Sequence, residues 1–313
     1  MKEASIAVIF PGQGSQRAGM GKDFYDAFKE SRIIYEEASD ILEWDVAAMC
    51  FEDNESLHQT EYSQPCILTT EVAMYAGIRK RFNPLPDVFG GHSLGEYAAM
   101  VAAGAMPFSE TLKIVEKRGR YMQKAAPASG GRMVAVIGDN LNVDTVKAAI
   151  GTLSVDIANI NSKDQIVVSG SADHIEQAKV NIGKALPDDR SLRFVDLNVS
   201  APFHSRFMAD VRERFFSVLK SAKDIIFPDH AKKVTSNYTG DFHSGDSEDI
   251  INNLVMQISG TVDWCANMRR LAGKAEKIYE VGPNRPLRNF FKTLGISCIS
   301  ITSVSAANRV FDA

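Results

Sequence analysis

One serine in this sequence lies between two glycines in a pattern that exposes a reactive hydroxyl. The run from Gly91 to Gly95 reads Gly-His-Ser-Leu-Gly, and it lies between an apolar segment at 86–89 and an alanine-rich segment at 96–103. The spacing GxSxG is typical of a sharp turn from a strand into a helix, where only glycine tolerates the close approach of the backbones. Free N–H groups at the start of such a helix favour developing negative charge. The pattern therefore predicts that Ser93 is a nucleophile.

Six histidines could supply the base that a serine nucleophile needs. His204 follows the strand expected over 192–197 by a short turn, a position where α/β folds place functional groups. We therefore expect His204 to be the base, and its alternative role is to cap the helix expected from Arg206. His92 is adjacent to Ser93 and should point elsewhere. The other four are expected in polar surface segments: His58, His174, His230 and His243.

A second glycine loop, from Phe10 to Gln16, follows the apolar segment 6–10. Its sequence, Phe-Pro-Gly-Gln-Gly-Ser-Gln, suits either a phosphate cradle or an oxyanion hole. No Gly-Lys-Ser/Thr follows, so a P-loop is disfavoured. We expect an oxyanion hole in which one backbone N–H comes from Gln13 and the other from Leu94, the residue after the serine.

A basic cluster, Lys117-Arg118-Gly119-Arg120, lies in a segment that is expected to be helical. Charges grouped on a helix usually face solvent. Arg118, however, stands beside a glycine in an otherwise apolar helix, and an inward-facing guanidinium could bind a carboxylate through two parallel hydrogen bonds. The spacing alone leaves both interpretations open.

The elements around these residues predict an α/β fold in two parts. In the first part the apolar pattern and the Gly/Pro breaks indicate strands at 6–10, 86–89, 234–237 and 277–281 and helices at 67–82, 96–103 and 206–221.

The segment from 130 to 198 has a different pattern from the rest of the chain. It is expected to form, in order, a strand, a helix, two strands, a helix and a strand, at 133–137, 143–150, 155–159, 165–170, 172–186 and 192–197. This βαββαβ order is ferredoxin-like. We therefore predict a large catalytic domain made of 1–129 and 199–313, with a ferredoxin-like subdomain inserted at 130–198.

Length, composition and charge exclude several classes of protein. The chain has 313 residues, of which 45% are apolar, enough for a large core, so a disordered or disulfide-stapled protein is excluded. The net charge of −4 argues against a general nucleic-acid binder. The apolar run at 6–10 is too short for a signal peptide or a membrane span. We expect a cytoplasmic monomer that binds neither membrane nor nucleic acid.

The cysteines suggest neither a metal site nor a disulfide framework, because they lie far apart and no CxxC spacing occurs. They are Cys50, Cys66, Cys265 and Cys298.

Several short sequence motifs are spread along nearly the whole chain. They are Phe10–Gln16, Gly91–Glu96, Lys117–Gln123, Asn159–Ser162, Ala201–Ser205 and Glu280–Pro283. In this order the motifs resemble those of the malonyl-CoA:acyl carrier protein transacylases. The resemblance implies an α/β-hydrolase-like large domain and a ferredoxin-like small one. It also implies malonyl transfer from malonyl-CoA to the phosphopantetheine thiol of an acyl carrier protein, with no bound cofactor or metal.

The resemblance further implies a role for individual positions. Ser93 matches the nucleophile, His204 matches the base, and the main-chain carbonyl of Gln257 matches the group that orients the base. Arg118 matches the arginine that binds the malonyl carboxylate. Gln13 matches the oxyanion-loop residue.

Three further positions are expected to contact the substrate. Phe203, directly before the histidine, resembles the malonyl-selective members of the family, and Asn161 and His92 lie in matching motifs.

The same residues distinguish malonyl transfer from two alternatives. A hydrolase that clears stalled acyl groups from carrier proteins would share Ser93 and His204, but a hydrolase of neutral acyl chains has no carboxylate for Arg118 to pair. A non-catalytic scaffold that docks carrier proteins would not need the intact set of Ser93, His204 and Gln13. Whether the carrier protein serves fatty acid or polyketide synthesis is left open by the sequence.

Carrier proteins are usually acidic, whereas this chain is itself net negative. A local basic patch must therefore steer their association. We expect one of two clusters to border the entrance to the site: Lys117, Arg120 and Lys124, or Arg285, Arg288 and Lys292.

Overall fold

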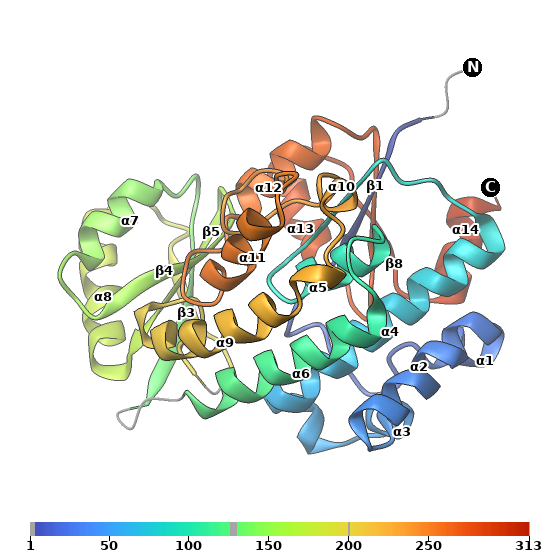
Figure 1. Ribbon diagram of the computed structural model, residues 1–313. Helices are drawn as coiled ribbons and strands as arrows, with labels where there is room; N and C mark the ends of the chain where they lie inside the picture. The colour runs from blue at the N-terminus through green and yellow to red at the C-terminus, as the bar shows by residue number, and fades with distance from the viewer. Residues whose placement is uncertain (1–3, 126–129, 200, 313) are drawn as a thin grey trace.

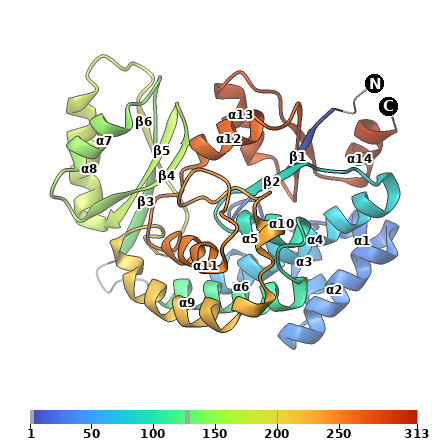
Figure 2. The ribbon, with the colours of Figure 1, turned by 45° about the horizontal axis from the view of Figure 1, so that its top comes forward.

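Two four-stranded sheets, one parallel and one antiparallel, make up the α/β architecture of this chain. A computed structural model describes residues 4–125, 130–199 and 201–312. Figures 1 and 2 show the antiparallel sheet with its two helices on one side of the molecule, and the parallel sheet with the remaining helices on the other. The loop 126–129, where we expect the first domain boundary, lies outside the described residues.

The parallel sheet is buried on both faces. Its strands are β1 (Ile6–Phe10), β2 (Val88–Gly91), β7 (Lys277–Val281) and β8 (Ile299–Ile301), in the order β2-β1-β7-β8. Side chains alternate across β1: Val8 and Phe10 enter one core, and Ala7 and Ile9 enter another. This is why the strand reads as an unbroken apolar run rather than an alternating one.

Helices cover both faces of this sheet (Figure 1). One face is covered by α12 (Trp264–Ala272) and α13 (Pro286–Thr293). The core on the other face contains side chains from α1 (Lys22–Ala27), α2 (Lys29–Leu42), α3 (Val46–Phe51), α4 (Thr60–Phe82), α5 (Gly95–Ala102), α6 (Phe108–Lys124), α9 (Ala209–Ser221), α10 (Pro228–Ala231), α11 (Ser247–Met256) and α14 (Val304–Phe311).

The antiparallel sheet carries two helices on one face and packs against the main core with the other. Its strands are β3 (Gly131–Ile137), β4 (Val155–Ser162), β5 (Gln165–Ser171) and β6 (Arg193–Asp196), in the order β4-β5-β3-β6, with the helices α7 (Val143–Ile150) and α8 (Ala172–Ala185). Val134 and Val136 of β3 enter the core under the helices, whereas Met133 and Ala135 enter the main core.

One expected strand is absent, because 234–237 forms only isolated bridges. Val234 pairs with Phe89 beside β2, and Thr235 pairs with Phe242. The next residues use their backbone N–H groups in a turn: Ser236 donates to the Asp241 carbonyl. The helix expected from Arg206 also differs, since it opens as a short 3-10 turn, Arg206–Met208, before α9.

The carboxyl ends of β1, β2 and β7 meet at one edge of the parallel sheet, because adjacent strands run in the same direction. The loop at Pro11, the serine after Gly91 and the turn at Gly282 follow these ends. Binding sites in open α/β sheets form at this edge. No helix among the described residues is long and apolar enough to cross a membrane.

Candidate active site

Ser93 lies on a tight turn between β2 and α5. Its backbone has φ 52°, a left-handed conformation that is unusual for serine. A Cβ at Gly91 would lie 2.0 Å from the Gly95 carbonyl carbon, and a Cβ at Gly95 would lie 2.2 Å from the Phe10 carbonyl oxygen. The two glycines are therefore required, because any side chain there would collide with backbone. The Ser93 N–H donates to Asn237 Oδ1 at 2.5 Å, which holds the turn.

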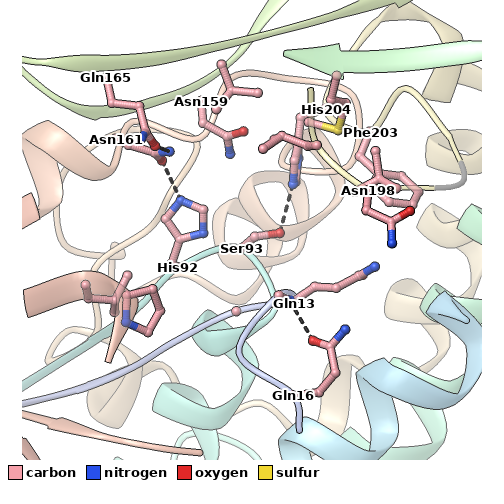
Figure 3. Close-up of a pocket in the computed structure, with 18 of the residues that line it drawn as sticks. Gln13, Gln16, His92, Ser93, Asn159, Asn161, Gln165, Asn198, Phe203 and His204 are labelled. Carbon is pink, nitrogen blue, oxygen red and sulfur yellow. Dashed lines mark hydrogen bonds between the residues drawn. The ribbon is translucent and has the colours of Figure 1, made fainter. Parts of the chain in front are cut away.

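The structure brings His204 to Ser93 over a sequence separation of 111 residues. His204 Nε2 lies 2.8 Å from Ser93 Oγ, and Nδ1 lies 2.7 Å from the main-chain oxygen of Gln257 (Figure 3 shows the first contact). A carbonyl can only accept, so Nδ1 carries the proton. Nε2 is then free to accept the serine proton, which is the arrangement of a general base and its nucleophile.

Burial sets the charge state of His204. The side chain is 5% exposed, and desolvation lowers its pKa to about 3, with a further contribution from the positive charge of Arg118. The imidazole is therefore neutral at neutral pH, as a base must be.

The pH profile should reflect this depressed pKa. We expect the acidic limb of kcat/KM to fall well below pH 6.5, towards about 3, since His204 stays unprotonated until then. The unfolded chain takes up this proton near 6.5 and the folded chain does not, so stability should also decrease as the pH falls from 6.5. The measurement is a pH series of initial rates, with circular dichroism at each pH to confirm folding. A limb at or above 6.5 in folded enzyme would contradict the assignment.

Arg118 points into the protein, unlike its basic neighbours. It is 1% exposed, whereas Lys117 and Arg120 are exposed. A Cβ at Gly119 would lie 2.8 Å from the Thr60 carbonyl oxygen, so the glycine lets α6 approach α4 and brings the arginine inward. Arg118 Nη2 donates to Ser93 Oγ at 3.1 Å. Burial lowers its pKa from the usual value.

A cavity of about 460 Å³ opens onto Ser93 between the two sheets. From the antiparallel sheet, Asn159, Asn161 and Gln165 line it with amide groups (Figure 3). His92 points away from Ser93 towards this sheet, where its Nε2 lies 2.7 Å from Asn161 Oδ1. The cavity therefore combines the Ser93 hydroxyl with hydrogen-bonding groups that could hold an extended polar substrate.

The remaining expected site residues also lie around this cavity. Phe203 lines it beside His204, and Gln13 lines the opposite side (Figure 3). The Gln13 side chain donates to Thr60 Oγ1 at 3.0 Å. Within the described residues, the backbone N–H groups of Gln13 and Leu94 donate to no protein acceptor. Both are therefore available to a developing oxyanion.

One histidine prediction is wrong: His243 is not on the surface. It is 3% exposed, and its Nε2 lies 2.9 Å from Glu96 Oε1. The residues around it in the sequence are polar, a pattern typical of a surface segment, and one of them, Asp246, caps the start of α11. His58 is exposed as expected but also lines the cavity.

Three buried polar residues of the site have no role assigned from their sequence pattern. Glu96, Asn237 and Gln64 are each fully buried and hydrogen-bonded to site residues. Glu96 alone had a usable signal, since an acid in an alanine-rich helix must find buried donors.

Known proteins resemble this chain in sequence and in fold. Residues 8–252 match the acyl transferase domain family. The chain is 34% identical to the malonyl CoA-acyl carrier protein transacylase of Bacillus subtilis, over 92% of this chain and 90% of that protein. It is 36% identical to the polyketide biosynthesis malonyl CoA-acyl carrier protein transacylase BaeC of Bacillus velezensis, over 90% of this chain and 94% of that protein. A malonyl-transacylase solved in complex with its type II PKS acyl-carrier protein has a TM-score of 0.89 and 28% identity, with 99% of each chain covered.

Proposed function

The chain belongs to the acyl transferase family, and we propose that it transfers a malonyl group from malonyl-CoA to the phosphopantetheine thiol of an acyl carrier protein. One observation carries this proposal. His204 Nε2 and Arg118 Nη2 both contact Ser93 Oγ, at 2.8 and 3.1 Å. A base and a cation that can bind a carboxylate thus meet at one hydroxyl, as transfer of a carboxylated acyl group requires.

In the first half-reaction, Ser93 Oγ attacks the thioester carbonyl of malonyl-CoA while His204 Nε2 takes the hydroxyl proton. The backbone N–H groups of Gln13 and Leu94 stabilise the oxyanion. The carbon–sulfur bond then breaks, and His204 returns the proton to the sulfur of coenzyme A. The product is a malonyl ester of Ser93 and free coenzyme A.

In the second half-reaction, the phosphopantetheine thiol of the carrier protein is the acceptor of the malonyl group. His204 accepts the thiol proton, the sulfur attacks the ester, and the proton passes to Ser93 Oγ as the ester bond breaks. Gln257 supports both steps, because its carbonyl keeps His204 Nδ1 protonated at 2.7 Å. These groups account for every bond made or broken, so the scheme includes no metal or resident cofactor.

Arg118 binds the malonyl carboxylate in this scheme. A buried carboxylate without a partner would be costly, and the guanidinium is already inside the site, 1% exposed. Phe203, Asn161 and His92 line the cavity and complete the surface around the acyl group and its pantetheine arm.

The division of the chain is part of the proposal. We assign 1–129 and 199–313 to an α/β-hydrolase-like catalytic domain and 130–198 to a ferredoxin-like subdomain. The strand order β4-β5-β3-β6 with α7 and α8 on one face supports the second assignment. The parallel sheet with a nucleophile on a strand-to-helix turn supports the first.

The enzyme is proposed to act as a cytoplasmic monomer. One chain supplies every residue in the scheme, which supports the monomer. The four cysteines are all free, which supports a reducing compartment. Relatives named for malonyl transfer, one of them in polyketide biosynthesis, support a carrier protein of fatty acid or polyketide synthesis as partner.

The hydrolase alternative is not favoured, since the relatives are transacylases and Arg118 faces Ser93. Intact-mass measurement after incubation with malonyl-CoA tests the proposal directly. We expect a malonyl adduct that disappears when a phosphopantetheinylated carrier protein is added and reappears on that protein. Release of free malonate faster than transfer would identify a hydrolase instead.

The helix α13 is expected to receive the carrier protein. Pro286, Leu287 and Phe290 line the cavity from this helix, and the basic residues Arg285, Arg288 and Lys292 around them are exposed. The other candidate cluster is less suited, because Arg120 already pairs with Glu116.

Charge reversal tests this surface. Arg285→Glu with Arg288→Glu should raise the KM for the carrier protein about tenfold at low salt, and added salt should weaken wild-type association. Lys117→Glu with Lys124→Glu is the matched control and should have little effect. A change confined to the KM of malonyl-CoA would show that α13 binds the phosphates of coenzyme A and not the carrier protein.

A further inference from the structure

Arg118 is a buried cation whose acceptors are all neutral. Nη1 donates to Gln64 Oε1 at 2.7 Å, and Nη2 donates to Gln257 Oε1 at 3.0 Å as well as to Ser93 Oγ. The guanidinium also lies 5.5 Å from the centre of the Tyr97 ring, within the range of a cation–π contact. In the part of the chain that the structure describes, no carboxylate forms an ion pair with it. Its charge is therefore available to a substrate.

Glu96 is a buried acid on the other side of Gln257. It is fully buried in the first turn of α5. Its Oε2 accepts from Gln257 Nε2 at 2.6 Å and from the Asn237 N–H at 3.0 Å, and its Oε1 lies 2.9 Å from His243 Nε2. None of these contacts is with substrate-facing atoms, so Glu96 can act on the reaction only through its partners.

The Gln257 side chain joins the two charges, and its orientation is determined from both ends. Its amide oxygen faces the Arg118 guanidinium, and its amide nitrogen faces the Glu96 carboxylate and the Ser93 carbonyl. The reversed amide would set NH₂ against a cation and oxygen against an anion, so it is strongly disfavoured. The main-chain oxygen of the same residue independently orients His204.

We propose that Glu96 is a positioning residue for Arg118, and that it acts through the Gln257 amide. The amide is hydrogen-bonded to the buried acid at one end and to the guanidinium at the other. It therefore holds the guanidinium in place and keeps the two charges apart. A direct Arg118–Glu96 ion pair would neutralise the guanidinium, and the acyl carboxylate would then have to displace a buried partner. This inference rests on the proposed function, because it assigns Glu96 and the Gln257 side chain to selection of a carboxylated acyl group.

A double-mutant cycle on acyl selectivity tests the proposal. The readout is the ratio of kcat/KM for malonyl-CoA to that for acetyl-CoA. Gln257→Met keeps the length and the main-chain oxygen but removes the amide, so the ratio should fall about tenfold or more. Glu96→Gln leaves the Gln257 amide free to reverse and should lower the ratio in the same direction. In the Gln257→Met background, Glu96→Gln should leave the ratio unchanged.

The ratio of the two kcat/KM values separates a loss of Arg118 positioning from a general loss of activity. Loss of the Glu96 contact to Asn237 would disturb the Ser93 turn and lower kcat/KM for both substrates by the same factor. This effect therefore cancels in the ratio. Glu280→Gln is the matched control: Glu280 is also fully buried, but it accepts from Leu287 N and Arg288 N at the start of α13 and from Ser300 Oγ in β8. It should not change the ratio.

Three results would overturn the proposal: an unchanged ratio in Glu96→Gln, additive effects in the double variant, or a ratio that rises. The last would mean that Glu96 acts through its charge alone. Absence of any malonyl adduct on the unmodified enzyme would refute the proposed function and this inference together, whereas an unchanged ratio in an enzyme that forms the adduct refutes the inference only.

Discussion

Ser93→Ala should abolish the malonyl adduct and lower kcat/KM by about 10⁴-fold or more, since removal of a serine nucleophile removes the covalent route altogether. The turn itself should survive, because alanine keeps the Ser93 N–H that donates to Asn237 Oδ1. The measurement combines intact mass after incubation with malonyl-CoA, peptide mapping of the adduct in the wild type, and the transfer rate to a carrier protein.

Ser169→Ala is a suitable control for the serine substitution. Ser169 is a fully buried serine in β5, and its hydroxyl has no partner among the described residues, so its loss should leave the adduct intact. An adduct that maps to Cys66 or Cys265, or full activity in Ser93→Ala, would remove the acyl-serine mechanism.

Arg118→Ala should convert a malonyl-selective enzyme into one that favours neutral acyl groups. Removing one partner of a desolvated charge pair costs roughly 2–5 kcal/mol, a factor of about 30 to several thousand in malonyl transfer. Acetyl and longer neutral groups should be transferred as well or better, because they gain space and lose a mismatched charge. Arg118→Lys should recover only part of the loss, since an ammonium cannot form two parallel hydrogen bonds.

The measurement is again the ratio of kcat/KM for malonyl-CoA to that for acetyl-CoA, with hydrolysis followed in parallel. Lys117→Ala, at the exposed neighbour, should leave the ratio unchanged. The positive charge of Arg118 also depresses the pKa of His204, so the acidic limb of Arg118→Ala should move to higher pH. An unchanged ratio would show that Arg118 does not bind the carboxylate and would favour the acyl hydrolase.

Local patterns were sufficient for the elements that carry the chemistry. The strand at 6–10 agrees with β1 residue for residue, and the strand-turn-helix at Ser93 agrees with β2 and α5 within a few residues. These signals are strong because a parallel strand buried on both faces must be continuously apolar, and because the turn excludes a Cβ at Gly91 and Gly95. The order of strands and helices over 130–198 was likewise visible in the sequence.

The sequence could not determine which polar residues are buried together. His243 lies in a polar run typical of a surface loop, yet it pairs with Glu96, 147 residues away. The short strand expected at 234–237 was wrong for a related reason, because the backbone there bonds to its own turn and to Glu96. Such contacts depend on loops from distant parts of the chain, and no periodicity records them.

What the sequence by itself determined is therefore the set of reactive groups and the elements that carry them, since turn chemistry and hydrophobic period act over a few residues. Only the tertiary structure decided that Arg118 faces inward and that it meets Ser93 beside a neutral amide and not a carboxylate. The physical reason is that burial of a charge is decided by the groups that surround it. Those groups, Gln64, Tyr97 and Gln257, come from three separate helical regions that meet only in the folded protein.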